Sequence, residues 1–119
     1  MSLIKSYRDL FIWQKSMVLV IEVYEITKAF PSSEIYGLTS QLRRSAVSIP
    51  SNIAEGYGRK STNDYKRFLQ ISVGSLYELQ TQIEIAFNLK YLVEQKHKEI
   101  IDLSIEIDKM LYSIIQKIK

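Results

Sequence analysis

Apolar residues recur at every third or fourth position through four stretches of the chain, which is the spacing of one helix face. No stretch of useful length alternates apolar and polar residues as a half-buried strand does. The pattern predicts four helices, over residues 10–30, 35–57, 62–91 and 94–118, joined by short links. Short links make neighbouring helices antiparallel, so we expect an all-α fold: an antiparallel up-down-up-down four-helix bundle forming a single domain over residues 1–119.

Two prolines bear on the helix boundaries. Pro31 ends the first helix because the residue before a proline disfavours helical geometry, and Ser32 or Ser33 is then expected to cap the second helix. Pro50 lies inside the second helix, where it lacks a backbone donor and crowds the preceding turn. A kink or a broken turn is therefore expected at Pro50.

The apolar positions outnumber what the core of a single bundle needs. The first helix is apolar nearly all round in the run Met17 to Ile21, and the last helix carries two adjoining aliphatic faces. Because monomers rarely leave wide apolar patches bare, this surplus predicts self-association into a homo-oligomer. The alternative is that a short loop or the N-terminal arm, with Leu3, Ile4 and Tyr7, covers the extra surface.

Composition narrows the class of protein. The chain has 119 residues, of which 46% are hydrophobic and 24% charged, and it has no cysteine. It therefore should fold as one domain, without disulfides, thiolate metal sites or a cysteine nucleophile. The longest aliphatic run is far short of the roughly 20 residues that span a bilayer, and the first residues lack a signal-peptide pattern. We expect a cytoplasmic protein that has no contact with a membrane.

The few arrangements that resemble catalytic or metal sites are incomplete. Glu94 and His97 have the spacing that places two metal ligands on one helix face, but His97 is the single histidine of the chain and a di-metal site needs a second pair. Glu99, Asp102 and Glu106 recur at helical spacing opposite an apolar stripe, which is typical of a solvated face. We therefore expect no catalytic residues, no metal and no cofactor, and a protein that is not an enzyme.

Positive charge is concentrated in the first part of the chain. The formal net charge is +3, and residues 1–67 carry ten basic residues against six acidic ones. Four of these basic residues surround the predicted start of the third helix: Arg59, Lys60, Lys66 and Arg67. The free amides of a helix start favour a phosphate, so this group predicts contacts to a nucleic-acid backbone, although Asp64 competes for the same amides.

A second basic pair, Arg43 and Arg44, lies within the second helix, roughly 24 Å from Arg59 along the helix axis. The sequence leaves two interpretations open. The pair reaches Glu78 across an antiparallel neighbour and forms a structural ion pair, or it contacts nucleic acid. Three tyrosines near the basic residues are candidates for stacking on bases, although most tyrosines are expected to pack in the core or at interfaces: Tyr57, Tyr65 and Tyr77.

Several short motifs occur in a fixed order along the chain. They are Asp9-Leu10, Trp13-Gln14, Phe30-Pro31, Gly37-Leu38, Gln41-Leu42-Arg43-Arg44-Ser45-Ala46, Ile49-Pro50-Ser51-Asn52-Ile53-Ala54-Glu55-Gly56, Phe68-Leu69 and Gly74-Ser75-Leu76-Tyr77-Glu78-Leu79. Taken together they resemble the 23S rRNA-intervening sequence protein family over roughly residues 7–92. That family consists of small bacterial four-helix-bundle proteins, some of them encoded within insertions in large-subunit ribosomal RNA genes.

The resemblance carries functional expectations. The family is similar to the accessory variability protein of diversity-generating retroelements, a pentameric barrel that binds nucleic acid and a reverse transcriptase. The resemblance therefore implies a homo-oligomer, a pentamer, with nucleic-acid contacts at Arg43, Arg44 and Arg59, and it assigns no catalytic residue. We expect an oligomeric protein that binds structured RNA or DNA. The alternative is an interaction scaffold or accessory subunit for a protein partner such as a reverse transcriptase, without direct nucleic-acid binding.

Overall fold

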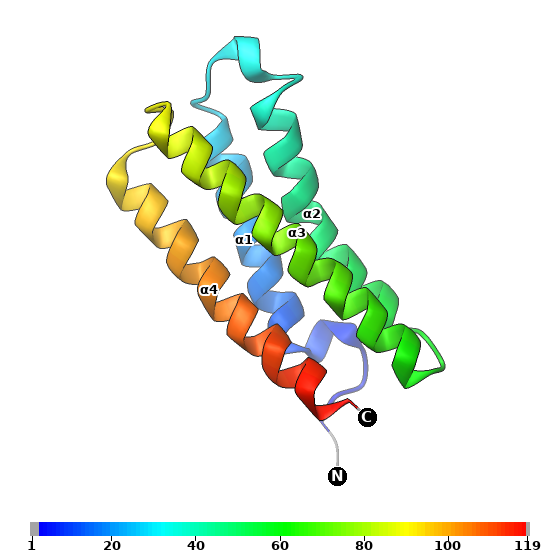
Figure 1. The fold of residues 1–119 in the computed structure, drawn as a ribbon. Coiled ribbons are helices and arrows are strands. Elements are labelled where there is room, and N and C mark those ends of the chain that lie inside the picture. The colour runs from blue at the N-terminus through cyan, green and yellow to red at the C-terminus, as the bar shows by residue number, and fades with distance from the viewer. Residues whose placement is uncertain (1–2, 119) are drawn as a thin grey trace.

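The computed structural model describes residues 3–118, which form four α-helices and two short 3-10 helices (Figure 1). No strand occurs among these residues, so the predicted all-α fold is confirmed. In chain order the elements are η1 (Tyr7–Asp9), α1 (Phe11–Thr27), η2 (Ser32–Glu34), α2 (Leu38–Tyr57), α3 (Thr62–Asn88) and α4 (Glu94–Lys117).

Helices α2 and α3 form the most extensive contact of the bundle, α1 packs against α2 and α4, and α4 also packs against α3 (Figure 1). Polar contacts also join α2 and α3. Ser45 Oγ donates to Gln82 Oε1 at 2.8 Å, and the hydroxyls of Ser48 and Ser75 lie 2.8 Å apart. Residue numbers fall along α3 as they rise along α2, so these two helices run antiparallel.

The core is built from the apolar stripes that the helical spacing predicts. Each of the four helices contributes side chains that are almost completely buried. Those with no exposed surface on α2 and α3 are Leu42, Ala46, Ile49, Ile53, Leu69, Leu76, Leu79, Ile83 and Ala86. Burying a side chain of leucine or isoleucine contributes about 1.5–3 kcal/mol, so this shared stripe makes the α2–α3 hairpin the main apolar contact of the fold.

The helix ends differ from the predicted ones by one to three residues at most positions. The start of α2 shows the physical reason. Neither Ser32 nor Ser33 caps it, because both lie in η2, one turn too early. Instead the carboxylate of Glu34 accepts a hydrogen bond from the backbone N–H of Leu38 at 3.1 Å. At the same end of the hairpin, α3 stops at Asn88 and Lys90 turns the chain with a left-handed φ of 66°.

The broken turn expected at Pro50 does not occur, since α2 runs without interruption from Leu38 to Tyr57. Pro50 is itself buried, and the adjacent Ile49 and Ile53 have no exposed surface. Burial of two such side chains contributes about 3–6 kcal/mol, which outweighs the roughly 3 kcal/mol cost of a proline inside a helix. Packing against the rest of the bundle therefore keeps the helix intact.

The surplus of apolar surface is present on α1. Its inner side is buried through residues such as Leu19 and Val23, while Phe11, Val18 and Ile21 on its outer side are 72%, 51% and 59% exposed. The N-terminal segment covers only part of α1, where η1 contacts the helix and Tyr7 meets Trp13 edge to face with 5.2 Å between ring centroids. Within residues 3–118, no helix combines the length and apolar character that crossing a membrane requires.

Candidate nucleic-acid interface

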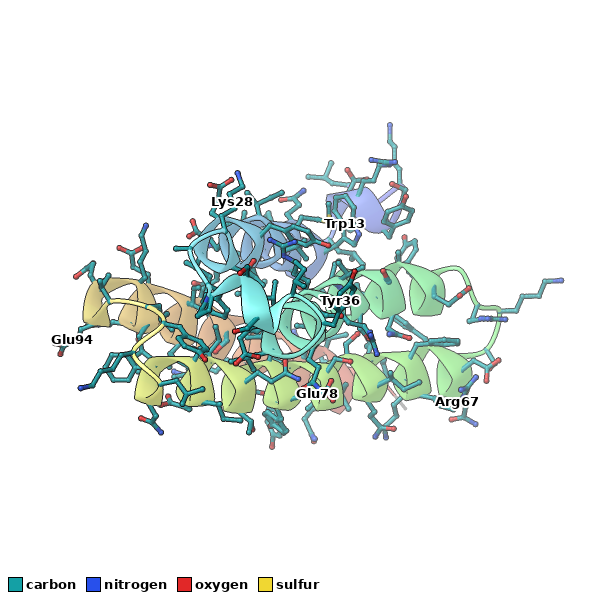
Figure 2. All side chains as sticks on the ribbon, turned by 90° about the horizontal axis from the view of Figure 1, so that it is seen from above. Trp13, Lys28, Tyr36, Arg67, Glu78 and Glu94 are labelled. Atoms are coloured by element: carbon teal, nitrogen blue, oxygen red, sulfur yellow. The ribbon has the colours of Figure 1, made fainter. Side chains whose placement is uncertain are left out.

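The predicted basic residues lie in two groups, one at the link between α2 and α3 and one in the first half of α2. The first, here called the turn cluster, comprises Arg59, Lys60, Lys66 and Arg67 at the link between α2 and α3. Ser61 sets its geometry, because its hydroxyl accepts the backbone N–H of Asp64 at 3.1 Å and so starts α3. Figure 2 shows Arg67 at this end of the hairpin. Lys66 is half-buried, and the other three side chains are exposed.

Phe68 organises the two arginines of the turn cluster. The guanidinium carbons of Arg59 and Arg67 lie over its ring, 4.8 Å and 4.7 Å from the centroid. Each cation also meets a carboxylate, Arg59 that of Glu55 at 3.3 Å and Arg67 that of Asp64 at 3.8 Å. Exposed ion pairs of this kind contribute little to stability. Their effect here is to hold two guanidiniums on either side of the link while leaving them in contact with solvent.

The two lysines of the turn cluster are not paired. Neither Lys60 nor Lys66 makes an ion pair with any residue in the described range 3–118. The cluster thus presents four cations against the two carboxylates that its arginines contact. An excess of positive charge at an exposed helix start is an arrangement that attracts phosphate.

Close approach of the two helices places Phe68 where the arginines can reach it. A Cβ at Gly56 would stand 2.7 Å from Phe68 Cβ and 3.3 Å from the carbonyl oxygen of Tyr65, so a larger residue does not fit without displacing α3. Sequence reasoning did not identify Phe68. In the sequence, Phe68 is an aromatic residue that directly follows Arg67. Nothing in the sequence indicates that the side chain of Arg59 also contacts its ring across the link.

The three tyrosines considered for base stacking are held within the fold. Tyr57 and Tyr65 meet edge to face with 6.1 Å between ring centroids, and burial raises the pKa of Tyr65 with a smaller effect from Tyr57. Tyr77 donates its hydroxyl proton to the carboxylate of Asp108 at 3.2 Å, and burial together with that carboxylate raises the pKa of Tyr77. These contacts give all three rings packing or positioning roles.

The second group, Arg43 and Arg44, lies in the first half of α2. The predicted ion pair with Glu78 does not form for either arginine within the described part of the chain. Arg43 turns toward α1 instead: its Nε donates to Thr27 Oγ1 at 2.9 Å, and its guanidinium lies 4.6 Å from the ring centroid of Tyr24.

Arg44 behaves differently from its neighbour. Its side chain is exposed and makes no ion pair with residues 3–118. The side chain of Arg43 is therefore held by α1, whereas that of Arg44 has no ion pair in the described chain. The contacts that fix Arg43, to Tyr24 and Thr27, join residues that lie far apart in the sequence and were not predicted.

No metal site accompanies these groups. Among residues 3–118 there is no cluster of three or more histidine, cysteine or carboxylate side chains that could hold a metal ion. His97 instead stacks on Phe87, with 4.1 Å between ring centroids, and its Nε2 lies 2.9 Å from a carboxylate oxygen of Glu84. The Glu94–His97 spacing thus occurs on a surface helix whose histidine contacts α3.

Comparison with known proteins identifies relatives of the chain. The model of the 23S rRNA-intervening sequence protein family matches residues 8–113. A crystal structure of a protein of unknown function from the S23 ribosomal protein family of Bacteroides thetaiotaomicron is similar, with a TM-score of 0.83 and 25% sequence identity. That similarity covers 89% of this chain and 99% of the Bacteroides protein. No curated protein matches the chain.

Proposed function

The chain belongs to the 23S rRNA-intervening sequence protein family, and from that premise we propose that it is a non-enzymatic, oligomeric protein that binds structured RNA or DNA. The observation that carries the proposal is the turn cluster, in which four exposed or half-exposed cations meet only two carboxylates. Contacts of lysine and arginine to phosphate supply most of the affinity of sequence-independent nucleic-acid binding.

The turn cluster combines two kinds of phosphate contact. Arg59 and Arg67, oriented over Phe68, offer planar forks of donors that match two phosphate oxygens. Lys60 and Lys66 add mobile point charges without a competing carboxylate partner in the described chain. Such contacts fix a nucleic-acid backbone on the protein surface but carry no information about its sequence.

A homo-oligomer, specifically a pentamer, is part of this proposal. The exposed apolar side of α1 supports it, because Phe11, Val18 and Ile21 would lose contact with water in an interface. The subunit would be an up-down-up-down bundle, in keeping with the antiparallel pairing of α2 and α3. Several turn clusters on one assembly would raise the apparent affinity without any new contact. Its location in the cytoplasm stays a prediction.

The exposed apolar surface also supports a second function. A protein partner, such as a reverse transcriptase, would cover the same side of α1, and the positive charge would then serve solubility alone. Salt separates the two functions, because phosphate contacts weaken steeply as salt rises while apolar docking persists or strengthens.

Charge reversal tests the proposal. Arg59→Glu/Lys60→Glu should abolish binding to labelled structured RNA and duplex DNA, while light scattering shows an assembly of unchanged mass. Lys96→Glu/Lys98→Glu reverses the same number of charges at the start of α4 and should retain most of the affinity. Equal affinity of both double variants would contradict a role for the turn cluster. Retention of binding at high salt by all proteins would favour the protein-partner function.

A further inference from the structure

A groove of about 580 Å³ lies between α1 and the first half of α2. Its polar lining consists of two guanidiniums, three side-chain hydroxyls and one phenol: Arg43, Arg44, Thr39, Ser40, Ser48 and Tyr24. No carboxylate is among the described residues that line it. A volume of this size is within the range of sites that hold small ligands, and its polar groups are those that contact phosphate.

Thr39 presents its hydroxyl to this groove. The residue is only 2% exposed, and its hydroxyl makes no hydrogen bond with the described residues. Within the same residues, no fully enclosed side-chain nitrogen or oxygen lacks a partner. The Thr39 hydroxyl must therefore open onto the groove that it lines. A hydroxyl that opens onto a groove can donate a hydrogen bond to a group that enters it, or accept one from that group.

The side chains of the two arginines in the groove differ in how firmly they are held. Arg43 is fixed by its hydrogen bond to Thr27 and by the Tyr24 ring, so little side-chain freedom is lost when a ligand binds. Arg44 is exposed and makes no ion pair in the described chain. The carboxylate of the neighbouring loop is already engaged, because Glu34 accepts hydrogen bonds from the Tyr91 hydroxyl at 2.9 Å and from Leu38 N–H.

The loop that contributes Ile35 to this groove also carries an exposed aromatic ring. Tyr36 is 94% exposed and directly follows Ile35, which lines the groove. Figure 2 shows Tyr36 beside the start of α2, on the loop that leads into the helix. A ring so exposed contributes almost nothing to the core of the subunit. Every nucleic-acid base has a face that stacks on such a ring, and the stack does not depend on base identity.

We propose that this groove binds one unpaired nucleotide of an RNA or DNA strand, with its phosphate on Arg43, Arg44 and Thr39 and its base stacked on Tyr36. The inference rests on the proposed nucleic-acid function and goes beyond it. The turn cluster contacts any phosphate backbone, whereas the groove requires a base that is free to leave its stack. The protein would therefore prefer nucleic acids that contain single-stranded segments over uninterrupted duplexes.

Fluorescence anisotropy with three probes of equal length tests this inference: a labelled oligothymidylate, an abasic strand and a blunt duplex. The wild-type protein should bind the oligothymidylate more tightly than the other two. Tyr36→Ala should weaken oligothymidylate binding about five-fold or more, which is the low end for loss of one base–aromatic stack. It should leave the affinities for the abasic strand and the duplex unchanged. Tyr36→Phe keeps a ring and should restore oligothymidylate binding.

Arg44→Gln provides a second test of the groove. It should weaken the binding of both the oligothymidylate and the abasic strand, because it removes a contact to phosphate and not to a base. Wild-type protein that binds all three probes equally, with Tyr36→Ala indistinguishable from it, would overturn the groove site while the proposed function stands. Absence of binding to every probe at low salt would overturn both. A changed assembly mass in Tyr36→Ala would also overturn the groove site, by showing that the ring belongs to a subunit interface.

Discussion

The turn cluster and the arginine pair of the groove contain similar residues but differ in how those residues are held. In the turn cluster, Arg59 and Arg67 lie over one ring at the molecular surface, and two lysines beside them have no ion-pair partner in the described chain. Around the groove, one arginine is held by α1 and the other is exposed, next to a threonine whose hydroxyl opens onto the groove and makes no hydrogen bond with residues 3–118.

The difference shows how surroundings decide what an arginine does. Charges at an exposed turn act over a distance on any polyanion and depend strongly on salt. Charges in a groove lined by hydroxyls act on a ligand of defined shape, because their geometry is set before the ligand arrives. We therefore propose general attraction of polyanions for the turn cluster and selection of unpaired nucleotides for the groove.

The largest effect should come from separating α2 and α3 beneath the turn cluster. Gly56→Leu places a side chain where a Cβ already meets Phe68 at 2.7 Å, so we expect a loss of about 3 kcal/mol in the free energy of unfolding. Urea denaturation measures this change in the free energy of unfolding. The matched control is Gly74→Ala, which has nothing within 4 Å and should stabilise the protein by about 0.5–1 kcal/mol. Equal midpoints for the two variants would contradict the tight approach at Gly56.

A smaller effect should distinguish the two arginines of the groove. Arg43→Met removes the hydrogen bond to Thr27 and the contact with Tyr24, and we expect a loss of about 1–2 kcal/mol in stability. Arg44→Met removes no ion pair in the described chain and should change stability by no more than about 0.5 kcal/mol. Thermal unfolding followed by circular dichroism compares them. If Arg44→Met were the more damaging change, the division of roles between them would be wrong.

The smallest effect should appear when one carboxylate is removed from the turn cluster. Glu55→Gln frees Arg59 from its 3.3 Å ion pair and raises the local charge, so affinity for a duplex should rise about two- to five-fold at low salt. Glu94→Gln removes the same charge at the start of α4 and serves as the control. Binding isotherms at two salt concentrations provide the measurement. A weaker Glu55→Gln complex would show that this carboxylate positions Arg59 productively.

The helices themselves could be predicted because apolar spacing depends only on which residues face the core. The ends of the helices were harder to predict from the sequence. The cap of α2 comes from Glu34, four residues before Leu38, and the end of α3 depends on Lys90 adopting a left-handed conformation that glycine more commonly adopts. Neither the Glu34 cap nor the left-handed conformation of Lys90 has a strong signal in the neighbouring sequence. Of the kink or broken turn expected at Pro50, the broken turn does not occur, because burial of the neighbouring residues outweighs local propensity.

The candidate site was predictable only in part. Sequence spacing placed Arg59 and Arg67 at one link correctly, since neighbours in the chain remain neighbours in space. Of the two interpretations that it left open for Arg43, the ion pair with Glu78 does not form, because Ser45 lies opposite Gln82 and the arginine faces α1. Phe68, Tyr24 and Thr39 gain their roles from contacts between separate helices. Such contacts follow from packing and register, which a single sequence does not display.

The salt dependence of binding to a structured RNA with single-stranded loops tests the central claim most directly. It should be measured with the wild-type assembly and with Lys60→Gln/Lys66→Gln. The account predicts binding at low salt whose logarithm falls linearly with the logarithm of salt concentration, with a shallower slope for the variant because fewer phosphates are neutralised. Absence of binding at low salt, or an affinity that does not change with salt, would contradict the account and leave the protein-partner function to be pursued.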